Sequence, residues 1–87
     1  MRFTKAQALV IYNKLKSQNK NVNWRKIPFE EFAVGINVEL EHGLKYKRYG
    51  TNVTNDNPII SGKIALIHII EVEDYYTKLR KYVDPGI

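Results

Sequence analysis

The stretch that decides the fold is residues 59–72, Ile-Ile-Ser-Gly-Lys-Ile-Ala-Leu-Ile-His-Ile-Ile-Glu-Val. Its many β-branched residues favour a strand, whereas its length favours a buried helix. Ser61 can cap such a helix, although Gly62 weakens the first turn. We follow the length and predict a helix, which makes the whole chain all-α.

Residues 4–17 have the pattern of an amphipathic helix. Thr4 is placed to cap its start, and Gln7 follows at the spacing of a capping box. The apolar positions recur at helical spacing and are Ala8, Leu9, Tyr12 and Leu15. After the turn residues 17–21, we expect Val22 and Trp24 to anchor the connection on the core, because an indole is costly to leave in water.

A second helix is expected to begin near Pro28 and to end at Gly43. Its apolar stripe consists of Phe29, Phe32, Ile36 and Leu40, and acidic residues at 30–31 suit the positive end of the helix dipole. Gly35 lies inside this helix, where glycine costs about 1 kcal/mol relative to alanine. We therefore expect it to let another backbone approach closely.

The remaining segments complete a small domain. Residues 43–58 are predicted to form one long ordered loop, neither helix nor strand, because asparagine, aspartate and threonine bond to local backbone. Asp74 is expected to cap a last short helix with Tyr75, Leu79 and Tyr82 on one face, and residues 84–86 to form a turn. The result is a single domain, a bundle of three to four helices, in which residues 1–28 are a basic helix and connector and residues 29–82 the core.

The composition excludes several classes of protein. The 87 residues include no cysteine, so disulfide scaffolds, thiolate metal sites and cysteine nucleophiles are ruled out. No apolar run approaches the roughly 20 residues of a membrane helix, and the first residues are too polar for a signal peptide. No glycine-rich phosphate-binding loop is present.

The positive charge is concentrated in two segments. Residues 1–28 carry seven basic and no acidic side chains, residues 29–44 carry four glutamates and no Lys or Arg, and residues 45–48 are basic again. Such segments suit a nucleic acid or another polyanion, although a solvated face beside an acidic face of the same fold is the simpler interpretation. The candidate contact residues are Lys14, Lys16, Lys20, Arg25, Lys26, Lys45, Lys47 and Arg48.

The two histidines each lie three residues from a glutamate, in the pairs Glu39–His42 and His68–Glu71. Residues three apart share a helix face, so two facing helices could supply four ligands to a divalent metal ion. Only the first pair has the Glu-x-x-His order of di-iron bundles. Two alternatives remain, namely buried ionic pairs that tie the helices together, and catalysis with Glu39 or Glu71 as general base, for which no adjacent nucleophile is evident.

A mixture of aromatic and basic residues is the other notable feature. Such a mixture is typical of surfaces on which nucleobases stack against tyrosines and cationic side chains. More commonly these tyrosines border a small core, with the hydroxyl at the surface. The residues concerned are Tyr46, Tyr49, Tyr75, Tyr76 and Tyr82, with Lys47, Arg48 and Arg80.

Four motifs occur in order between residues 35 and 79. They are Gly35-x-x-Val38-Glu39-x-Glu41-His42-Gly43, Thr51-Asn52-Val53-Thr54-Asn55-Asp56, Gly62-Lys63-Ile64-Ala65-x-x-His68-x-x-Glu71 and Asp74-Tyr75-Tyr76-Thr77-x-Leu79. As a set they resemble a small family of unknown function from bacteria, tailed phages and large DNA viruses. The resemblance covers residues 29–82. The chain departs from the family pattern at Val72-Glu73, where a proline-containing turn is usual.

The resemblance carries no activity with it. It implies that the Glu-His pairs and the polar loop of Thr51, Asn52, Thr54, Asn55 and Asp56 belong together, since core packing alone does not demand those residue types. It thereby implies a shared polar or metal-containing centre of Glu39, His42, His68 and Glu71, joined by Asn55 or Asp56. Nothing is implied for residues 1–28.

Two functional hypotheses follow. The first is a non-enzymatic binding or structural module, cytoplasmic or virion-associated, whose partner is a protein, a virion component or a nucleic acid. In this hypothesis the Glu-His pairs are structural. The second is a metal-binding protein or metal-dependent hydrolase that uses the same four residues.

Overall fold

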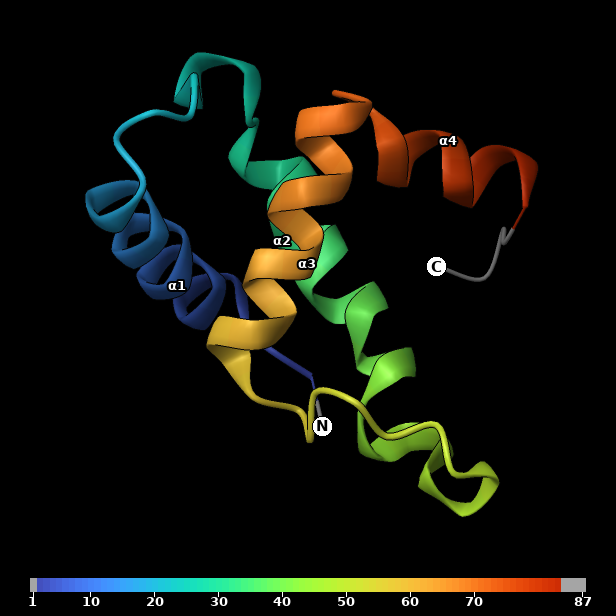
Figure 1. Cartoon of the computed structure of the whole chain (residues 1–87). Helices are drawn as coiled ribbons and strands as arrows, with labels where there is room; N and C mark the ends of the chain where they lie inside the picture. Colours follow the sequence, from blue (N-terminus) through green and yellow to red (C-terminus); the bar gives the residue numbers. More distant parts are fainter. Residues whose placement is uncertain (1, 84–87) are drawn as a thin grey trace.

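The structure, a computed structural model, describes residues 2–83, and the turn expected at residues 84–86 lies outside them. Within that range the chain forms four α-helices and three 3₁₀ segments and no strand, which confirms the all-α prediction (Figure 1). The elements are α1 (Lys5–Gln18), η1 (Trp24–Lys26), α2 (Phe29–Val38), η2 (Glu39–His42), η3 (Leu44–Tyr49), α3 (Pro58–Glu71) and α4 (Tyr75–Tyr82). No helix among the described residues is long and apolar enough to cross a membrane.

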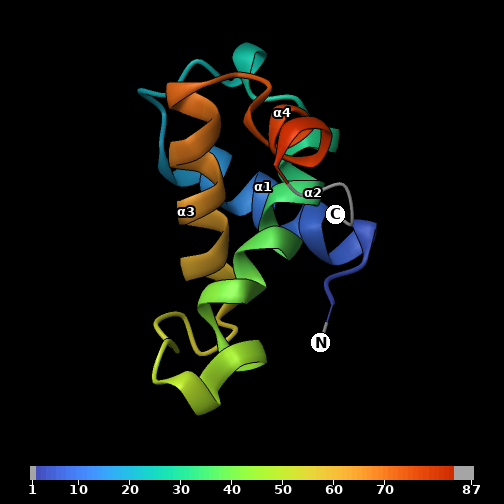
Figure 2. The ribbon, with the colours of Figure 1, turned by 90° about the vertical axis from the view of Figure 1, so that its right-hand side faces the viewer.

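Helix α2 lies at the centre and packs against the other three α-helices. In Figure 1, α3 crosses in front of it, α1 lies to one side and α4 runs outward from the upper end of α3, and Figure 2 shows the arrangement from the side. An aromatic group joins α1, η1 and α2, because Tyr12 makes edge contacts with Trp24, Phe29 and Phe32 at 5.3–5.5 Å between ring centroids. Trp24 donates its Nε1 proton to the Asn19 carbonyl at 2.9 Å, which confirms its role as an anchor.

Helix α1 begins as predicted, with one exception in its buried face. Thr4 and Gln7 form the full capping box. Leu9 was expected in the core but is 45% exposed. Ala8, Tyr12 and Leu15 already define the buried stripe, and Leu9 lies about 100° around the helix from Ala8. Phe3, which precedes the helix, is buried instead.

Helix α2 begins at Phe29, with Pro28 in the capping position, and ends sooner than expected. After Val38 the chain tightens into the 3₁₀ segment η2, and Gly43 follows it. Residues i and i+3 eclipse one another in a 3₁₀ helix, so Glu39 and His42 still lie on one side. Asn37 forms two hydrogen bonds that the sequence did not predict. Its side chain accepts from Phe3 N at 2.8 Å and donates to Phe3 O at 3.0 Å.

Helix α3 confirms that residues 59–71 are helical, but the predicted end residue Val72 is extended and Ser61 is not the cap. Asn57 caps the helix, because its Oδ1 accepts from the backbone N–H groups of Ile59 and Ile60 at 2.9 and 3.0 Å, and Pro58 occupies the first position. Ser61 and Gly62 are buried instead. A Cβ at Gly62 would lie 2.9 Å from Ile11 Cγ2, so the absence of a side chain lets α1 and α3 approach closely.

The long connection is ordered, as expected, but it is partly helical. Residues 44–49 form η3, which ends at Gly50 in the left-handed conformation. Asn55 and Asp56 also have positive φ, at 52° and 56°, which are angles that Asn and Asp tolerate better than most residues. The helix break at Val72 is formed by one extended residue, without proline.

Candidate functional site

The polar centre of the molecule is the carboxylate of Glu39, whose side chain is only 3% exposed. Its Oε2 accepts a hydrogen bond from the Tyr76 hydroxyl at 2.7 Å and lies 3.3 Å from Nδ1 of His68. One carboxylate at the end of α2 therefore contacts side chains of both α3 and α4. A buried charge requires such partners, because its removal from water is otherwise too costly.

Tyr76 connects the carboxylate to the imidazole. Its hydroxyl lies 2.9 Å from His68 Nδ1, and the residue is completely buried. Because the hydroxyl proton is donated to Glu39, the imidazole must carry its proton on Nδ1 and donate it to the tyrosine oxygen. Burial first, and then the hydrogen bond to Glu39, raise the pKa of Tyr76 above its ordinary value of 10.0.

Aromatic stacking holds the histidine in place. The His68 ring stacks on Tyr75 with 4.5 Å between centroids and 10° between planes, and it meets Tyr76 edge-on at 5.9 Å. Tyr75 and Tyr76 are themselves in edge contact. The imidazole is thus positioned both by its hydrogen bond and by two rings from α4. We name Glu39, His68 and Tyr76 the buried triad, after its two buried members. The His68 side chain is 29% exposed.

The predicted four-residue centre is only partly assembled. His42 contributes a weak contact, since its Nε2 lies 3.6 Å from Glu39 Oε1 and its side chain is 57% exposed. Glu71 is exposed and forms no hydrogen bond or ion pair with the buried triad in the described part of the chain. Within residues 2–83, no group of three or more His, Asp or Glu side chains is arranged to hold a metal ion. The helical spacing placed His68 correctly but directed Glu71 to solvent.

A second carboxylate, that of Glu31 in α2, attaches the start of α4. Thr77 donates its backbone N–H to Glu31 Oε2 at 2.9 Å, and its hydroxyl also donates to the carboxylate. Asp74, expected to cap this helix, makes no capping bond and instead pairs with Lys78 at 3.4 Å. The cap of α4 is therefore supplied by a residue distant in sequence, which local pattern analysis does not detect.

The polar loop forms a separate structure and does not join the buried triad. Asp56 Oδ1 accepts from Leu44 N at 2.9 Å, and the buried Thr54 Oγ1 accepts from Asp56 N at 3.2 Å. Gly43 lies against both side chains, and a Cβ there would overlap Asp56. The side-chain bonds from Thr51 Oγ1 to Tyr46 O and from Asn55 N to Asn52 Oδ1 also stay within the connection. The backbone N–H groups of Val53 and Thr54 attach the loop to the end of η2, because both donate to His42 O, at 2.6 and 3.0 Å. These residue types are explained by loop closure.

The candidate basic residues separate into two groups at opposite ends of the molecule. All eight are exposed. The first group follows the C-terminal half of α1 and η1, whereas the second lies on η3, at the far end in both views (Figures 1 and 2). In the η3 group, Lys45 lies over the Tyr46 ring and Arg48 over the Tyr49 ring. A single binding surface for one polyanion therefore does not include both groups of basic residues.

The tyrosines also differ from the expectation. Tyr46, Tyr49 and Tyr82 are exposed, with Tyr82 at 72%, so Tyr82 does not belong to the core as its helical spacing suggested. Tyr76 is buried together with its hydroxyl, which contradicts the expectation of a surface hydroxyl. The sequence signal that pointed to Tyr76 was its membership of the motif at 74–79.

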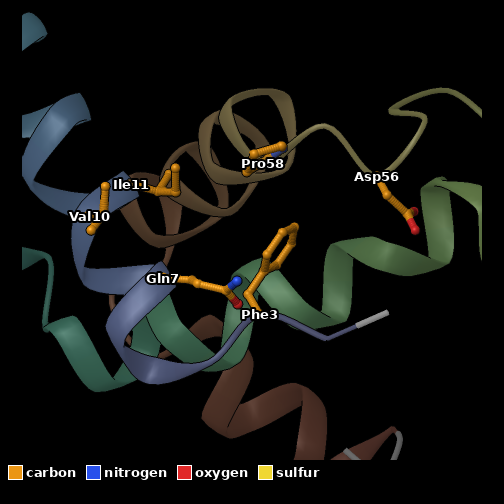
Figure 3. Close-up of a pocket in the computed structure, with 6 residues that line it drawn as sticks. All are labelled: Phe3, Gln7, Val10, Ile11, Asp56 and Pro58. Carbon is orange, nitrogen blue, oxygen red and sulfur yellow. The ribbon is translucent and has the colours of Figure 1, made fainter.

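A groove of about 290 Å³ lies between the first two turns of α1 and the start of α3 (Figure 3). It is lined by Phe3, Gln7, Val10, Ile11, Asp56 and Pro58. Its one titratable residue, Asp56, already uses Oδ1 to bind Leu44 N. The groove is thus mainly apolar and carries no arrangement of acid, base and nucleophile.

The fold and the buried triad define a class: a small helical domain in which one buried carboxylate links three helices through a tyrosine and a histidine. The chain belongs to a protein family of unknown function, DUF5661, whose family model matches residues 12–82. The match begins earlier than the resemblance at residues 29–82 indicated, and it includes the second half of α1 and all of η1. No curated protein and no solved structure gives a significant match.

Proposed function

We propose that this protein is a small non-enzymatic module that binds an acidic protein partner, as an accessory or virion-associated protein of a phage or large DNA virus. The binding role rests on one group of exposed cations, which we name the α1–η1 basic end. It consists of Lys14, Lys16, Lys20, Arg25 and Lys26, and none of them forms an ion pair within residues 2–83. Unpaired cations gathered at one end attract an anionic surface.

The placement of these cations favours a protein over a nucleic acid. Lys14 and Lys16 are two residues apart, so they lie about 200° apart around α1. Duplex-binding proteins instead present a continuous basic stripe or patch to the phosphates. Lys5, which would extend a row along α1, is paired with Glu30 at 3.3 Å.

The buried triad supports the non-enzymatic part of the proposal. Glu39 is 3% exposed and Tyr76 is completely buried, so the carboxylate and the phenol are covered by the fold. Their hydrogen-bonding groups are used to join α2, α3 and α4. A general base must come within hydrogen-bond reach of a substrate proton. We therefore assign the triad a structural role.

The test compares two variants that carry the same charge. One is Lys20→Gln, Arg25→Gln and Lys26→Gln, at the α1–η1 basic end, and the other is Lys45→Gln, Lys47→Gln and Arg48→Gln, on η3. Binding of a polyglutamate peptide is measured by fluorescence anisotropy at several salt concentrations. The first variant should bind about tenfold more weakly, because each exposed contact contributes roughly 0.5 kcal/mol. The second should bind like the wild type.

Each remaining result contradicts part of the proposal. Equal losses in both variants would attribute binding to net charge rather than to a surface. Affinity that does not change with salt would remove the electrostatic basis. A short DNA duplex bound far more tightly than polyglutamate, with the same loss in the first variant, would assign the basic end to nucleic acid.

One observation favours the second candidate, a metal ion at Glu39. Oε1 of Glu39 is buried without a hydrogen-bond partner in the described structure and faces His42 Nε2 at 3.6 Å. Two ligands that each lie 2.0–2.2 Å from a tetrahedral ion are about 3.3–3.6 Å apart. The distance between Glu39 Oε1 and His42 Nε2 has that size. Metal analysis of protein purified without chelators is the test. Stoichiometric metal that is lost in both His42→Ala and His68→Ala would support this candidate, and absence of metal with no thermal shift on adding zinc, iron or manganese would exclude it.

A further inference from the structure

Helix α3 exposes large apolar side chains on the side away from its buried face. The buried face consists of Ser61, Gly62, Ala65, Leu66 and Ile69. A surface helix normally carries polar residues on the side opposite to its buried face. The exposed isoleucines, which we name the α3 isoleucine face, are Ile60 at 42%, Ile67 at 53% and Ile70 at 49%.

One positive and one negative side chain lie at equal distances in sequence on either side of Ile67 on this face. Lys63 lies four residues before Ile67 and Glu71 four residues after it, and both are exposed. Residues four apart lie on the same side of a helix, so the cation, the isoleucine and the carboxylate form one row. Neither charge forms an ion pair within the described part of the chain.

We infer that α3 packs antiparallel against α3 of a second copy of this chain, about a twofold axis at Ile67. In such an interface residue i meets residue j of the partner, and j meets i. Ile67 then meets its own counterpart, and Ile64 meets Ile70. Lys63 of each copy faces Glu71 of the other, which forms two ion pairs and covers the isoleucines at once.

The charges determine the direction of the pairing. Parallel packing in the same register would place lysine against lysine and glutamate against glutamate, which is unfavourable. A helix of 14 residues is about 21 Å long, so the contact is shorter than a standard interface and should dissociate on dilution. This inference is independent of the proposed binding at the α1–η1 basic end, because it concerns a different surface.

The first experiment is sedimentation velocity of the full chain over a series of protein concentrations. We expect a reversible monomer–dimer equilibrium in the wild type. Ile67→Glu should raise the dissociation constant about a hundredfold, a loss typical of a disrupted interface centre. Leu9→Glu is the matched control, because Leu9 is similarly exposed, at 45%, and lies on the side of α1 opposite to Ile11, which contacts α3.

Charge reversal tests the register. Lys63→Glu and Glu71→Lys should each weaken the homodimer about tenfold, because each turns both ion pairs of the dimer into pairs of like charges. The double variant Lys63→Glu with Glu71→Lys should dimerise like the wild type, and circular dichroism confirms that each variant is folded. A wild type that remains monomeric at every concentration would overturn the inference. So would a double variant that is as weak as the single ones, or Leu9→Glu that is as damaging as Ile67→Glu.

Discussion

The ring of Tyr76 in α4 lies directly on Gly35 in α2, so closely that a Cβ at position 35 would lie 2.7 Å from Tyr76 Cδ2. The glycine was expected to admit another backbone, but it admits an aromatic side chain. The contact brings the Tyr76 hydroxyl to Glu39, one helical turn farther along the chain. The choice of glycine at 35 and the hydrogen bonds of the buried triad therefore depend on one another.

Gly35→Ala should destabilise the protein by about 2 kcal/mol, because the cost of overpacking exceeds the gain of about 1 kcal/mol in helix propensity. Urea unfolding followed by circular dichroism measures the change. In a Tyr76→Ala background the ring is absent, so the same substitution should be neutral or stabilising. A loss of equal size in both backgrounds would show that the ring is not the cause.

Tyr76→Phe should lower the free energy of unfolding by about 2 kcal/mol, because it leaves the buried Glu39 carboxylate without its closest donor. Tyr75→Phe is the control, since the Tyr75 hydroxyl forms no hydrogen bond in the described structure. It should change stability by less than about 0.5 kcal/mol. Comparable losses in the two variants would contradict a special role for the Tyr76 hydroxyl.

Stability should fall as the pH rises above 10, because burial and the hydrogen bond to Glu39 raise the pKa of Tyr76 in the folded state. Below that pH the phenol is protonated in both states. Above it the unfolded chain releases its proton first, so the free energy of unfolding decreases by about 1.4 kcal/mol per pH unit. Tyr76→Phe should show a shallower decrease, while Tyr12, whose pKa burial also raises, still contributes in both proteins. Identical slopes would refute this assignment.

The two histidines should differ in their effect on stability. His68→Ala removes the bond to Tyr76 and the stack on Tyr75, so we expect a loss of about 1–3 kcal/mol. His42→Ala removes only an exposed contact at 3.6 Å and should cost less than about 0.5 kcal/mol. Thermal unfolding monitored at two wavelengths distinguishes the cases. Equal effects would favour a shared centre over the structural triad.

The free energy of unfolding should depend on the hydroxyl of Thr54 in the polar loop much more than on that of Thr51. Thr54→Val keeps the shape of a buried side chain but removes the acceptor for Asp56 N, at a cost of about 1–2 kcal/mol. Thr51→Val changes an exposed hydroxyl that bonds to Tyr46 O and should cost about 0.5 kcal/mol. Urea unfolding of both variants provides the comparison, and a larger effect at position 51 would be the contrary result.

Local chemistry in the sequence was sufficient for the helices and for one cap. The capping box at Thr4 and Gln7 and the length of residues 59–72 predicted α1 and α3 correctly. The sequence pattern failed to predict the cap of α4, because a residue distant in the sequence supplies it. Glu31 caps α4 in place of Asp74, because its carboxylate reaches the first turn of that helix from α2. Spacing alone also gave no sign that Glu71 points to solvent.

By itself, the sequence determined the helical class, because period, length and capping are local properties of the chain. An association of Glu39 with a histidine of another helix was one of the alternatives that the sequence left open. Only the tertiary structure decided that His68 rather than His42 is the main imidazole partner, and that Tyr76 joins them. It also separated the basic residues into two ends and turned the isoleucines of α3 outward. These outcomes depend on how each helix is rotated, and the small residues at positions 35, 62 and 65 set that rotation by permitting close packing.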